Sequence, residues 1–166
     1  MSSSRRGAAF WISTWGPVVL AIAVICIEST EAMGADHTSG PLHRLFEAIF
    51  GRIDDDSWNL IHHILRKSGH FVGYGLVGLT WFRAWWRAFP STSFFRCMLF
   101  ALLGTFLVAS GDEWHQTFLP NRSGQFTDVL LDCTGSLVIL SVTYLFLRVC
   151  HSRTLLLRDA ACRRPN

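Results

Sequence analysis

Charged residues are scarce in this sequence. Asp, Glu, Lys and Arg make up 16% of the 166 residues, and half of the residues are hydrophobic, whereas a soluble domain has about 25% charged residues. The five cysteines form no CxxC pair, and most lie within or beside apolar runs, where a free thiol behaves as a small hydrophobic side chain. No internal repeat or low-complexity tract is present. The composition favours an integral membrane protein without a disulfide framework.

Four stretches are long and apolar enough, or nearly so, to cross a bilayer as helices. About 30 Å of hydrocarbon takes roughly 20 helical residues. The first stretch contains Pro17, which we expect to restart or kink its first turn, and no A-x-A cleavage site follows it, so we interpret it as a span rather than a signal peptide. We predict an all-α, polytopic membrane protein whose four transmembrane helices form a bundle, near residues 10–28, 69–86, 94–109 and 126–147.

The arginines predict an orientation. Ten of them flank the first predicted span, the connection between the second and third, and the end of the fourth: Arg5, Arg6, Arg83, Arg87, Arg96, Arg148, Arg153, Arg158, Arg163 and Arg164. The positive-inside rule places these residues in the cytoplasm. We therefore predict a multi-pass protein of the bacterial cytoplasmic (inner) membrane with both termini inside. This distribution bears on topology, and we expect membrane lipids rather than nucleic acid as partners.

The first outer connection, 29–68, is too long for a turn and too polar to span. Four of its apolar residues recur at helical spacing and predict a short amphipathic helix over 42–50, an interfacial helix or a lid: Leu42, Leu45, Phe46 and Ile49. We expect a loop over 31–41 and another helix after an N-cap at Ser57 or one of Asp54, Asp55 and Asp56. The predicted organisation is a cytoplasmic N-terminus 1–9, a first span 10–28, this connection, a core 69–150 and a basic tail 151–166.

Polar residues gather where three predicted spans reach the outer face. Each group has helical spacing and so shares one side of its helix: Lys67, His70 and Tyr74; Asp112, Glu113 and Gln116; Asp128, Asp132 and Gly135. Arg122 follows Pro120 in a connection short enough to make the last two helices antiparallel neighbours. We expect the three groups to meet. Small residues are expected to allow close helix approach: Gly69, Gly73, Gly104 and Gly135.

Acidic residues in a membrane are costly and are normally paired or turned into a wet cavity. The acids in these groups could pair with Lys67, His70 and Arg122 as structural clasps. Four carboxyl groups against so few basic residues favour instead a functional pocket at the outer face, in which crowded acids hold or pass protons.

Two segments carry a family resemblance, "RKSGHFVGY" and "SGDEWHQTFLPNRSGQFTDVLLDCTG". Together they resemble the VanZ-like family of small bacterial membrane proteins, at Lys67, His70, Phe71, Tyr74, Asp112, Glu113, Gln116, Pro120, Arg122, Asp128, Asp132 and Gly135. The sequence departs from the family pattern at Gly73, Asn121 and Asp132, where an acid, a glycine and an asparagine are frequent. The resemblance implies a cell-envelope protein, because the family's namesake is associated with low-level resistance to teicoplanin, a glycopeptide that binds cell-wall precursors.

Two functions remain open at this point. The first is a binding pocket for a lipid-linked or cell-wall-related anionic group, contacted by charge-assisted hydrogen bonds and formed by Lys67, His70, Tyr74, Asp112, Glu113, Gln116, Arg122, Asp128 and Asp132. The alternative is an intramembrane hydrolase or transferase acting on a lipid-linked phosphate. There, His70 is the general acid or base and Asp112, Glu113 or Asp128 is its partner.

A metal site is a further alternative, because histidine and carboxylate side chains suit zinc. Its ligands would come from His62, His63, His70, Asp112, Glu113, His115 and Asp128, but no spacing among them is diagnostic. We therefore expect neither a metal nor a cofactor. A proton-coupled transporter is disfavoured, because the acids gather at one face instead of being spaced through the membrane.

Overall fold

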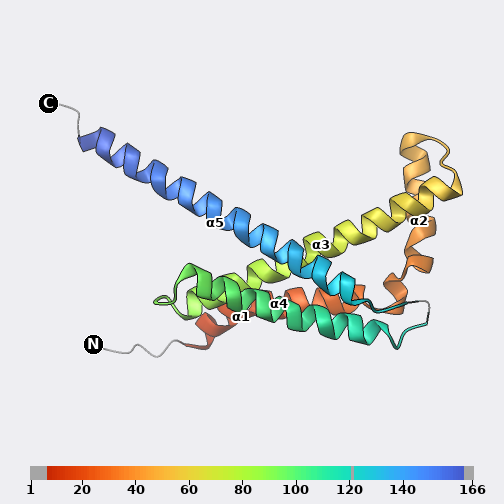
Figure 1. Cartoon of the computed structure of the whole chain (residues 1–166), viewed down its shortest axis with the longest axis horizontal. Helices are drawn as coiled ribbons and strands as arrows, with labels where there is room; N and C mark the ends of the chain where they lie inside the picture. Colours follow the sequence, from red (N-terminus) through yellow and green to blue (C-terminus); the bar gives the residue numbers. More distant parts are fainter. Residues whose placement is uncertain (1–6, 121, 163–166) are drawn as a thin grey trace.

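The computed structural model describes residues 7–120 and 122–162, and it has helices but no strand within them (Figure 1). The predicted all-α class is therefore confirmed. The elements are α1 (Ala8–Glu28), a 3₁₀ turn η1 (Glu31–Met33), α2 (Ala35–Phe50), α3 (Asp55–Ala88), α4 (Phe94–Gln116) and α5 (Phe126–Cys162).

Helix α3 is the centre of the molecule, because α1, α4 and α5 all pack on it. Its crossing with α5 is the most extensive interface. Two glycines make this crossing close: a Cβ on Gly135 would overlap the carbonyl oxygen of Phe71, and one on Gly78 would overlap the Ser136 side chain. A Cβ on Gly104 would lie 2.8 Å from the ring of Trp81, so α3 and α4 also approach closely there. The expectation was therefore correct for Gly104 and Gly135.

The predicted close approach at Gly69 was wrong. A Cβ on Gly69 would meet nothing within 4 Å, and one on Gly73 would make only an ordinary contact with Ile25 at 3.7 Å. The two glycines have the small-xxx-small spacing, but they lie on a face of α3 that does not pack against α5.

Two apolar clusters hold the helices together. One lies behind the polar groups and contains Ile25, Tyr74, Val77, Ala109 and Val129; the other lies nearer the opposite end and contains Phe82, Cys97, Ala101 and Leu140. At that opposite end Trp15 of α1 packs edge-on against Trp81 and Trp85 of α3, with ring centroids 5.8 and 5.3 Å apart.

Within the described residues, three helices are long and apolar enough to cross a membrane: Ala8–Glu28, Phe94–Gln116 and Phe126–Cys150. Large apolar side chains such as Leu20, Leu107 and Phe146 are exposed on them, as a surface that faces lipid requires. Helix α3 contains the second of the four predicted spans, residues 69–86, but is not among these three helices. Glycine, histidine, tyrosine and tryptophan replace aliphatic residues along it, which lowers its hydropathy.

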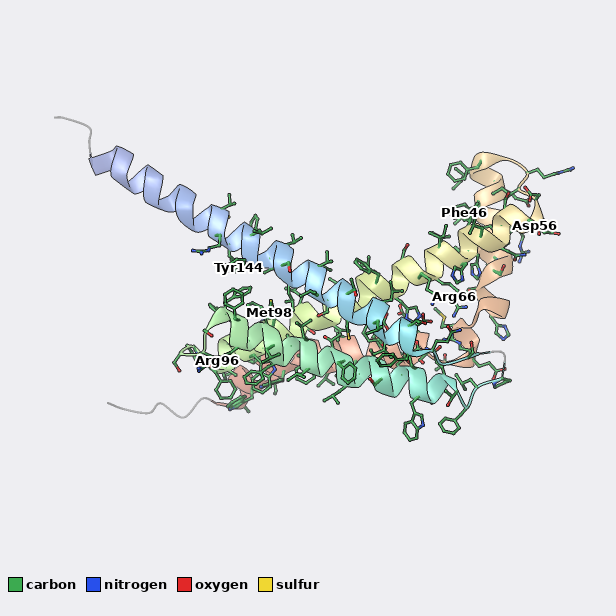
Figure 2. All side chains as sticks on the ribbon, in the orientation of Figure 1. Phe46, Asp56, Arg66, Arg96, Met98 and Tyr144 are labelled. Carbon is green, nitrogen blue, oxygen red and sulfur yellow. The ribbon has the colours of Figure 1, made fainter. Side chains whose placement is uncertain are left out.

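Helix α1 begins and α5 ends at one end of the molecule, while α2, the start of α3 and the connection between α4 and α5 lie at the other (Figure 1). Figure 2 separates the two ends by residue: Phe46 and Asp56 mark the α2 end, and Arg96, Met98 and Tyr144 lie toward the opposite one. The polar groups singled out in the sequence belong to the α2 end.

Helix α3 differs from the prediction in length. It starts after Asp54, whose carboxylate accepts a hydrogen bond from the Ser57 amide at 2.9 Å, as an N-cap does. It then continues through Gly69 to Ala88 without a break. The last third of the expected outer connection is therefore the first part of α3.

The loop expected over 31–41 was also wrong. A 3₁₀ turn and then α2 occupy it, and Pro41 lies inside α2. Packing against α3 outweighs the local breaker signals: the Trp58 indole donates a hydrogen bond to the Ser39 hydroxyl at 2.7 Å and stacks on His43 with centroids 4.6 Å apart. Helix α1 likewise continues through Pro17.

Candidate functional site

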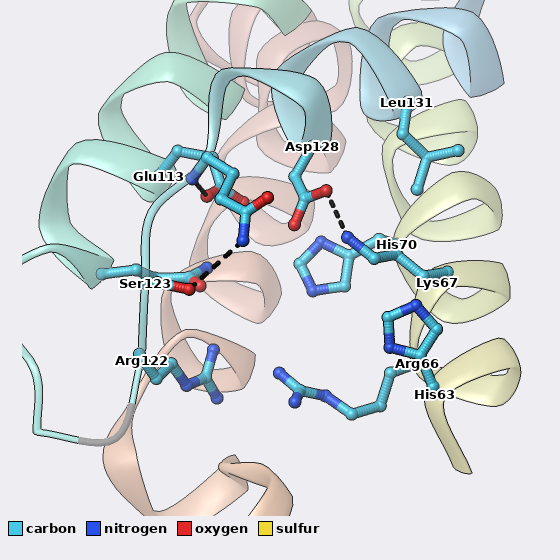
Figure 3. Close-up of a pocket in the computed structure, with 11 residues that line it drawn as sticks. His63, Arg66, Lys67, His70, Glu113, Arg122, Ser123, Asp128 and Leu131 are labelled. Carbon is cyan, nitrogen blue, oxygen red and sulfur yellow. Dashed lines mark hydrogen bonds and ion pairs between the residues drawn. The ribbon is translucent and has the colours of Figure 1, made fainter. Parts of the chain in front are cut away.

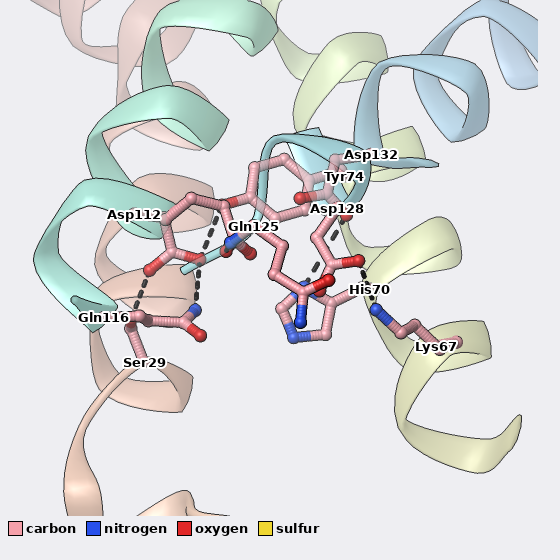
Figure 4. A network of polar contacts seen from close by, with 10 residues as sticks. Ser29, Lys67, His70, Tyr74, Asp112, Gln116, Gln125, Asp128 and Asp132 are labelled. Atoms are coloured by element: carbon pink, nitrogen blue, oxygen red, sulfur yellow. Dashed lines mark hydrogen bonds and ion pairs between the residues drawn. The ribbon is translucent and has the colours of Figure 1, made fainter. Parts of the chain in front are cut away.

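Asp112, near the end of α4, joins three helices (Figure 4). Its Oδ1 accepts a hydrogen bond from the hydroxyl of Ser29 at the end of α1. Its Oδ2 accepts from the Tyr74 hydroxyl of α3 at 2.9 Å and from the Gln116 amide one turn further along α4 at 3.2 Å. The side chain is 9% exposed. Three neutral donors therefore stabilise a buried carboxylate and fix its orientation.

His70 and Asp132 face each other across the crossing of α3 and α5. The imidazole Nδ1 lies 3.6 Å from the Asp132 Oδ1. Asp132 is completely buried, and neither of its carboxylate oxygens has a hydrogen-bond partner within the described part of the chain. The ring of His70 also stacks on Tyr74, with centroids 6.2 Å apart. This geometry orients the imidazole and leaves Asp132 without close compensation.

Two further acids line the open side. Asp128, in the first turn of α5, forms an ion pair with Lys67 of α3. Glu113 is 5% exposed, and its Oε2 accepts a hydrogen bond from the backbone amide of Gln125 at 2.8 Å. Gly124 permits that bond, because a Cβ there would overlap the carbonyl oxygen of Glu113.

The expected ion pair between Arg122 and an acid does not form among the described residues. Its Nη2 donates hydrogen bonds to the backbone carbonyls of Glu28 at 3.3 Å and Thr30 at 3.2 Å. These carbonyls belong to the end of α1, where a helix leaves its last carbonyls without partners. Burial, and then the nearby Arg66 guanidinium, lower the pKa of Arg122 from its usual value, and the group remains a cation.

These side chains enclose a polar cavity of about 180 Å³ at the α2 end (Figure 3). Arg66 and Arg122 face each other across it. The lining residues come from α3, the end of α4, the connection and the start of α5: His63, Arg66, Lys67, His70, Glu113, Gln116, Arg122, Ser123, Gln125, Asp128 and Leu131. Basic side chains outnumber the acidic ones around it.

Two cavities with mainly apolar walls adjoin the polar one. The first, about 470 Å³, shares His63, Lys67 and Leu131 with it and is otherwise lined by Ile64, Ser68, Phe71 and Val72. The second, about 220 Å³, shares Arg66, His70 and Arg122 with it and extends past Met33, Leu42 and Leu65. The polar cavity thus lies between two apolar grooves.

All nine residues predicted to bind a ligand lie in or directly behind this cavity. Six line it, and Tyr74, Asp112 and Asp132 form the layer beneath. Sequence reasoning missed Ser29, Arg66 and Gln125, and it named His63 only as a candidate metal ligand. Arg66 stands four residues before His70, so helical spacing could have found it; nothing local to Ser29 points to Asp112.

The candidate metal ligands separate into two sets. His70, Asp112 and Glu113 each offer an atom within 4.8 Å of the others. His62 contacts Thr38 of α2 instead, with Nε2 3.3 Å from the hydroxyl, and His115 is exposed.

Comparison with known proteins identifies a family. The model of the VanZ/LLP1 family matches residues 14–148, which include every residue of the cavity and the layer beneath it. No curated protein and no solved structure matches the chain.

Proposed function

We propose that this chain, which belongs to the VanZ/LLP1 family, binds the anionic headgroup of a lipid-linked molecule at the outer face of the membrane. The observation that carries the proposal is the pair of guanidinium groups, Arg66 and Arg122, that face each other across the polar cavity. Like charges so placed repel each other, and an anion between them removes the repulsion. Guanidinium groups bind phosphate and carboxylate through paired hydrogen bonds.

The charge balance supports an anion. Lys67 is neutralised by Asp128, and Arg122 contacts only backbone carbonyls among the hydrogen bonds of the described residues. Arg66 has no ion pair with an acid in the described part of the chain. Neither guanidinium group therefore has an acid in direct contact within the described residues, and Asp112 and Glu113 attract Arg122 only from a greater distance.

The apolar grooves support a lipid-linked ligand over a free anion. A headgroup in the polar cavity can extend a hydrocarbon chain past Ile64, Phe71 and Val72, or on the other side past Leu42 and Leu65. Ligand sites combine a few polar anchors with apolar walls in this way.

We further propose that α3 crosses the membrane beside α1, α4 and α5, making four spans with both termini in the cytoplasm of a bacterial cell. The arrangement of Figure 1 supports it, because α1 begins and α5 ends at the same end of the bundle. Basic residues at that end, among them Arg83, Arg87 and Arg96, support the orientation by the positive-inside rule. The cavity then faces outward, where lipid-linked cell-wall precursors are used.

An enzyme that acts on a lipid-linked phosphate is the second candidate. The contact of His70 with the buried Asp132 favours it, because a carboxylate on one ring nitrogen orients the other for proton transfer. Incubation of purified protein with lipid-linked phosphates would release phosphate, and His70→Ala would abolish the release. Absence of turnover across a panel of such lipids removes this candidate and leaves the binding site intact.

Binding can be measured with a polyprenyl pyrophosphate and purified protein in nanodiscs. Arg66→Gln and Arg122→Gln should each weaken binding by about 10–100-fold, because each removes charge-assisted hydrogen bonds of about 1.5–3 kcal/mol. Arg52→Gln removes an exposed arginine outside the cavity and should change nothing. Equal binding by wild type and Arg66→Gln refutes the proposal, and equal affinity for inorganic pyrophosphate refutes the lipid-linked part of it.

The cell-envelope role has a separate test. Deletion of the gene should change the abundance of lipid-linked precursors or the susceptibility of the cells to teicoplanin, and the wild-type chain should restore it. Arg66→Gln should fail to restore it, while Arg52→Gln should succeed. If Arg66→Gln complements fully, the cavity is not responsible for the phenotype.

A further inference from the structure

Buried carboxylates are in excess in the wall of the cavity and in the layer beneath it. Glu113 of the wall and Asp112 and Asp132 of the layer are at most 9% exposed. No Lys or Arg in the described part of the chain forms an ion pair with any of them, and His70 is the single basic side chain in contact. Burying acids without a compensating charge is costly. Arg122 attracts Asp112 and Glu113 only from beyond ion-pair distance, so no cation other than His70 touches these acids among the described residues.

The position of Asp132 indicates where a cation would compensate the buried acids. It is fully buried, its two oxygens lack hydrogen-bond partners among the described residues, and it faces the Nδ1 of His70. This is the arrangement of a metal-binding histidine, which presents one nitrogen to the ion and the other to a carboxylate that fixes the ring. With Nδ1 turned to Asp132, Nε2 is the nitrogen left for a ligand.

We infer that His70, Asp112 and Glu113 bind a divalent first-row transition metal ion of the Zn²⁺ or Mn²⁺ type, with Asp132 as the positioning residue behind His70. Candidate ligand atoms of the three side chains lie within 4.8 Å of one another. Ligands at about 2.0–2.2 Å from one ion lie roughly 3–3.5 Å apart. Side-chain rotations that move each ligand atom by about an ångström would therefore bring the three atoms to coordination distance.

The hydrogen bonds already made leave room for the ion. Within the described part of the chain, the Asp112 Oδ1 accepts one hydrogen bond, from the Ser29 hydroxyl, which leaves one lone pair. Glu113 uses Oε2 for the Gln125 amide, and no hydrogen bond to its Oε1 occurs among the described residues. Gln116 and Tyr74 hold Asp112 from the other side. The same contacts that orient the carboxylates therefore act as outer supports of a metal centre.

The donor set selects the class of ion. One imidazole nitrogen with carboxylate oxygens suits Zn²⁺ or Mn²⁺, whereas Mg²⁺ and Ca²⁺ prefer oxygen alone. Three protein ligands leave a coordination position open. That position faces the polar cavity, since His70 and Glu113 also line it. The inference stands on these acids and this histidine and does not require the anionic headgroup.

The test measures metal directly. Purified full-length protein, stripped with chelator and dialysed against micromolar Zn²⁺ or Mn²⁺, should retain one ion per chain by mass spectrometry of the metal. Co²⁺ loaded in its place should give an absorption spectrum of four- or five-coordinate cobalt. His70→Asn and Glu113→Gln should lose the ion. Asp132→Asn should keep the cobalt spectrum but weaken affinity by about 10–100-fold.

The half-buried pair His43 and Glu47 of α2, 3.8 Å apart and outside the cavity, provides the matched control. His43→Asn with Glu47→Gln removes the same chemistry from α2 and should leave the ion in place. Thermal unfolding checks that each variant folds. Absence of a stoichiometric ion in the wild type overturns the inference, as do retention in His70→Asn and Glu113→Gln or binding of Mg²⁺ and Ca²⁺ alone. Arg66→Gln should retain the metal, so the outcomes for the ion and for the headgroup are separable.

Discussion

The crossing of α3 and α5 can be tested with one methyl group, in Gly135→Ala. The added Cβ would overlap the carbonyl oxygen of Phe71 and lie 2.9 Å from its carbonyl carbon and 3.1 Å from its Cα. These atoms are backbone in the middle of α3, so they cannot rotate away and the helices must separate.

The cost can be worked out from opposing effects. Overpacking costs about 1–3 kcal/mol, and contact with rigid backbone places this site near the upper value. Alanine is better than glycine within a helix by about 1 kcal/mol. We expect Gly135→Ala to lose about 2 kcal/mol of unfolding free energy. Because His70 precedes Phe71, the separation should also lengthen the 3.6 Å contact between His70 and Asp132.

Unfolding by SDS in mixed micelles, followed by circular dichroism, measures the change. Gly73→Ala, in α3, is the control, because its Cβ would meet only Ile25 at 3.7 Å. It should be neutral or stabilising by up to about 1 kcal/mol. If Gly135→Ala proves as stable as Gly73→Ala, then α3 and α5 do not touch here, and the placement of His70 against Asp132 fails with it.

Three further outcomes follow from other contacts. Gly124→Ala, whose Cβ would overlap the Glu113 carbonyl, should cost about 1–3 kcal/mol in the same titration; a more stable variant contradicts the packing. Burial, and then Arg66, lower the pKa of His62 below 6.5, so the unfolded state binds more protons than the folded state. The packing of α2 should therefore be complete above pH 6.5 and weaken as the pH falls toward the lower folded pKa. Faster hydrogen exchange in α2 at low pH would show this weakening, and His62→Gln should abolish the pH dependence. Trp58→Ala should cost about 3–5 kcal/mol and free α2 at every pH; unchanged α2 exchange would refute it.

Much of the site could be predicted from the sequence because its parts are local. Lys67, His70 and Tyr74 share a face through helical spacing alone, and a short connection forces the ends of α4 and α5 together. The same reasoning could have included Arg66, which is four residues from His70.

Partners across helices could not be predicted in this way. Ser29 meets Asp112 from 83 residues away, and Arg122 contacts the end of α1 instead of an acid. Each of these contacts depends on where α1 ends relative to α4. The helical spacing of neighbouring residues does not reveal that position. The length of α2 was missed for a related reason: Pro41 and its glycine neighbour signal a break, and packing on Trp58 outweighs them.

By itself, then, the sequence determined a helical membrane protein of the VanZ/LLP1 type and the helix faces on which its polar residues lie, because composition, period and motif are properties of neighbouring residues. The tertiary structure alone decided that Lys67 pairs with Asp128, that His70 faces Asp132, and that Arg66 and Arg122 oppose each other. Those pairings depend on the depth and register of the helix crossing at Gly135, and the crossing exists only once the helices have packed.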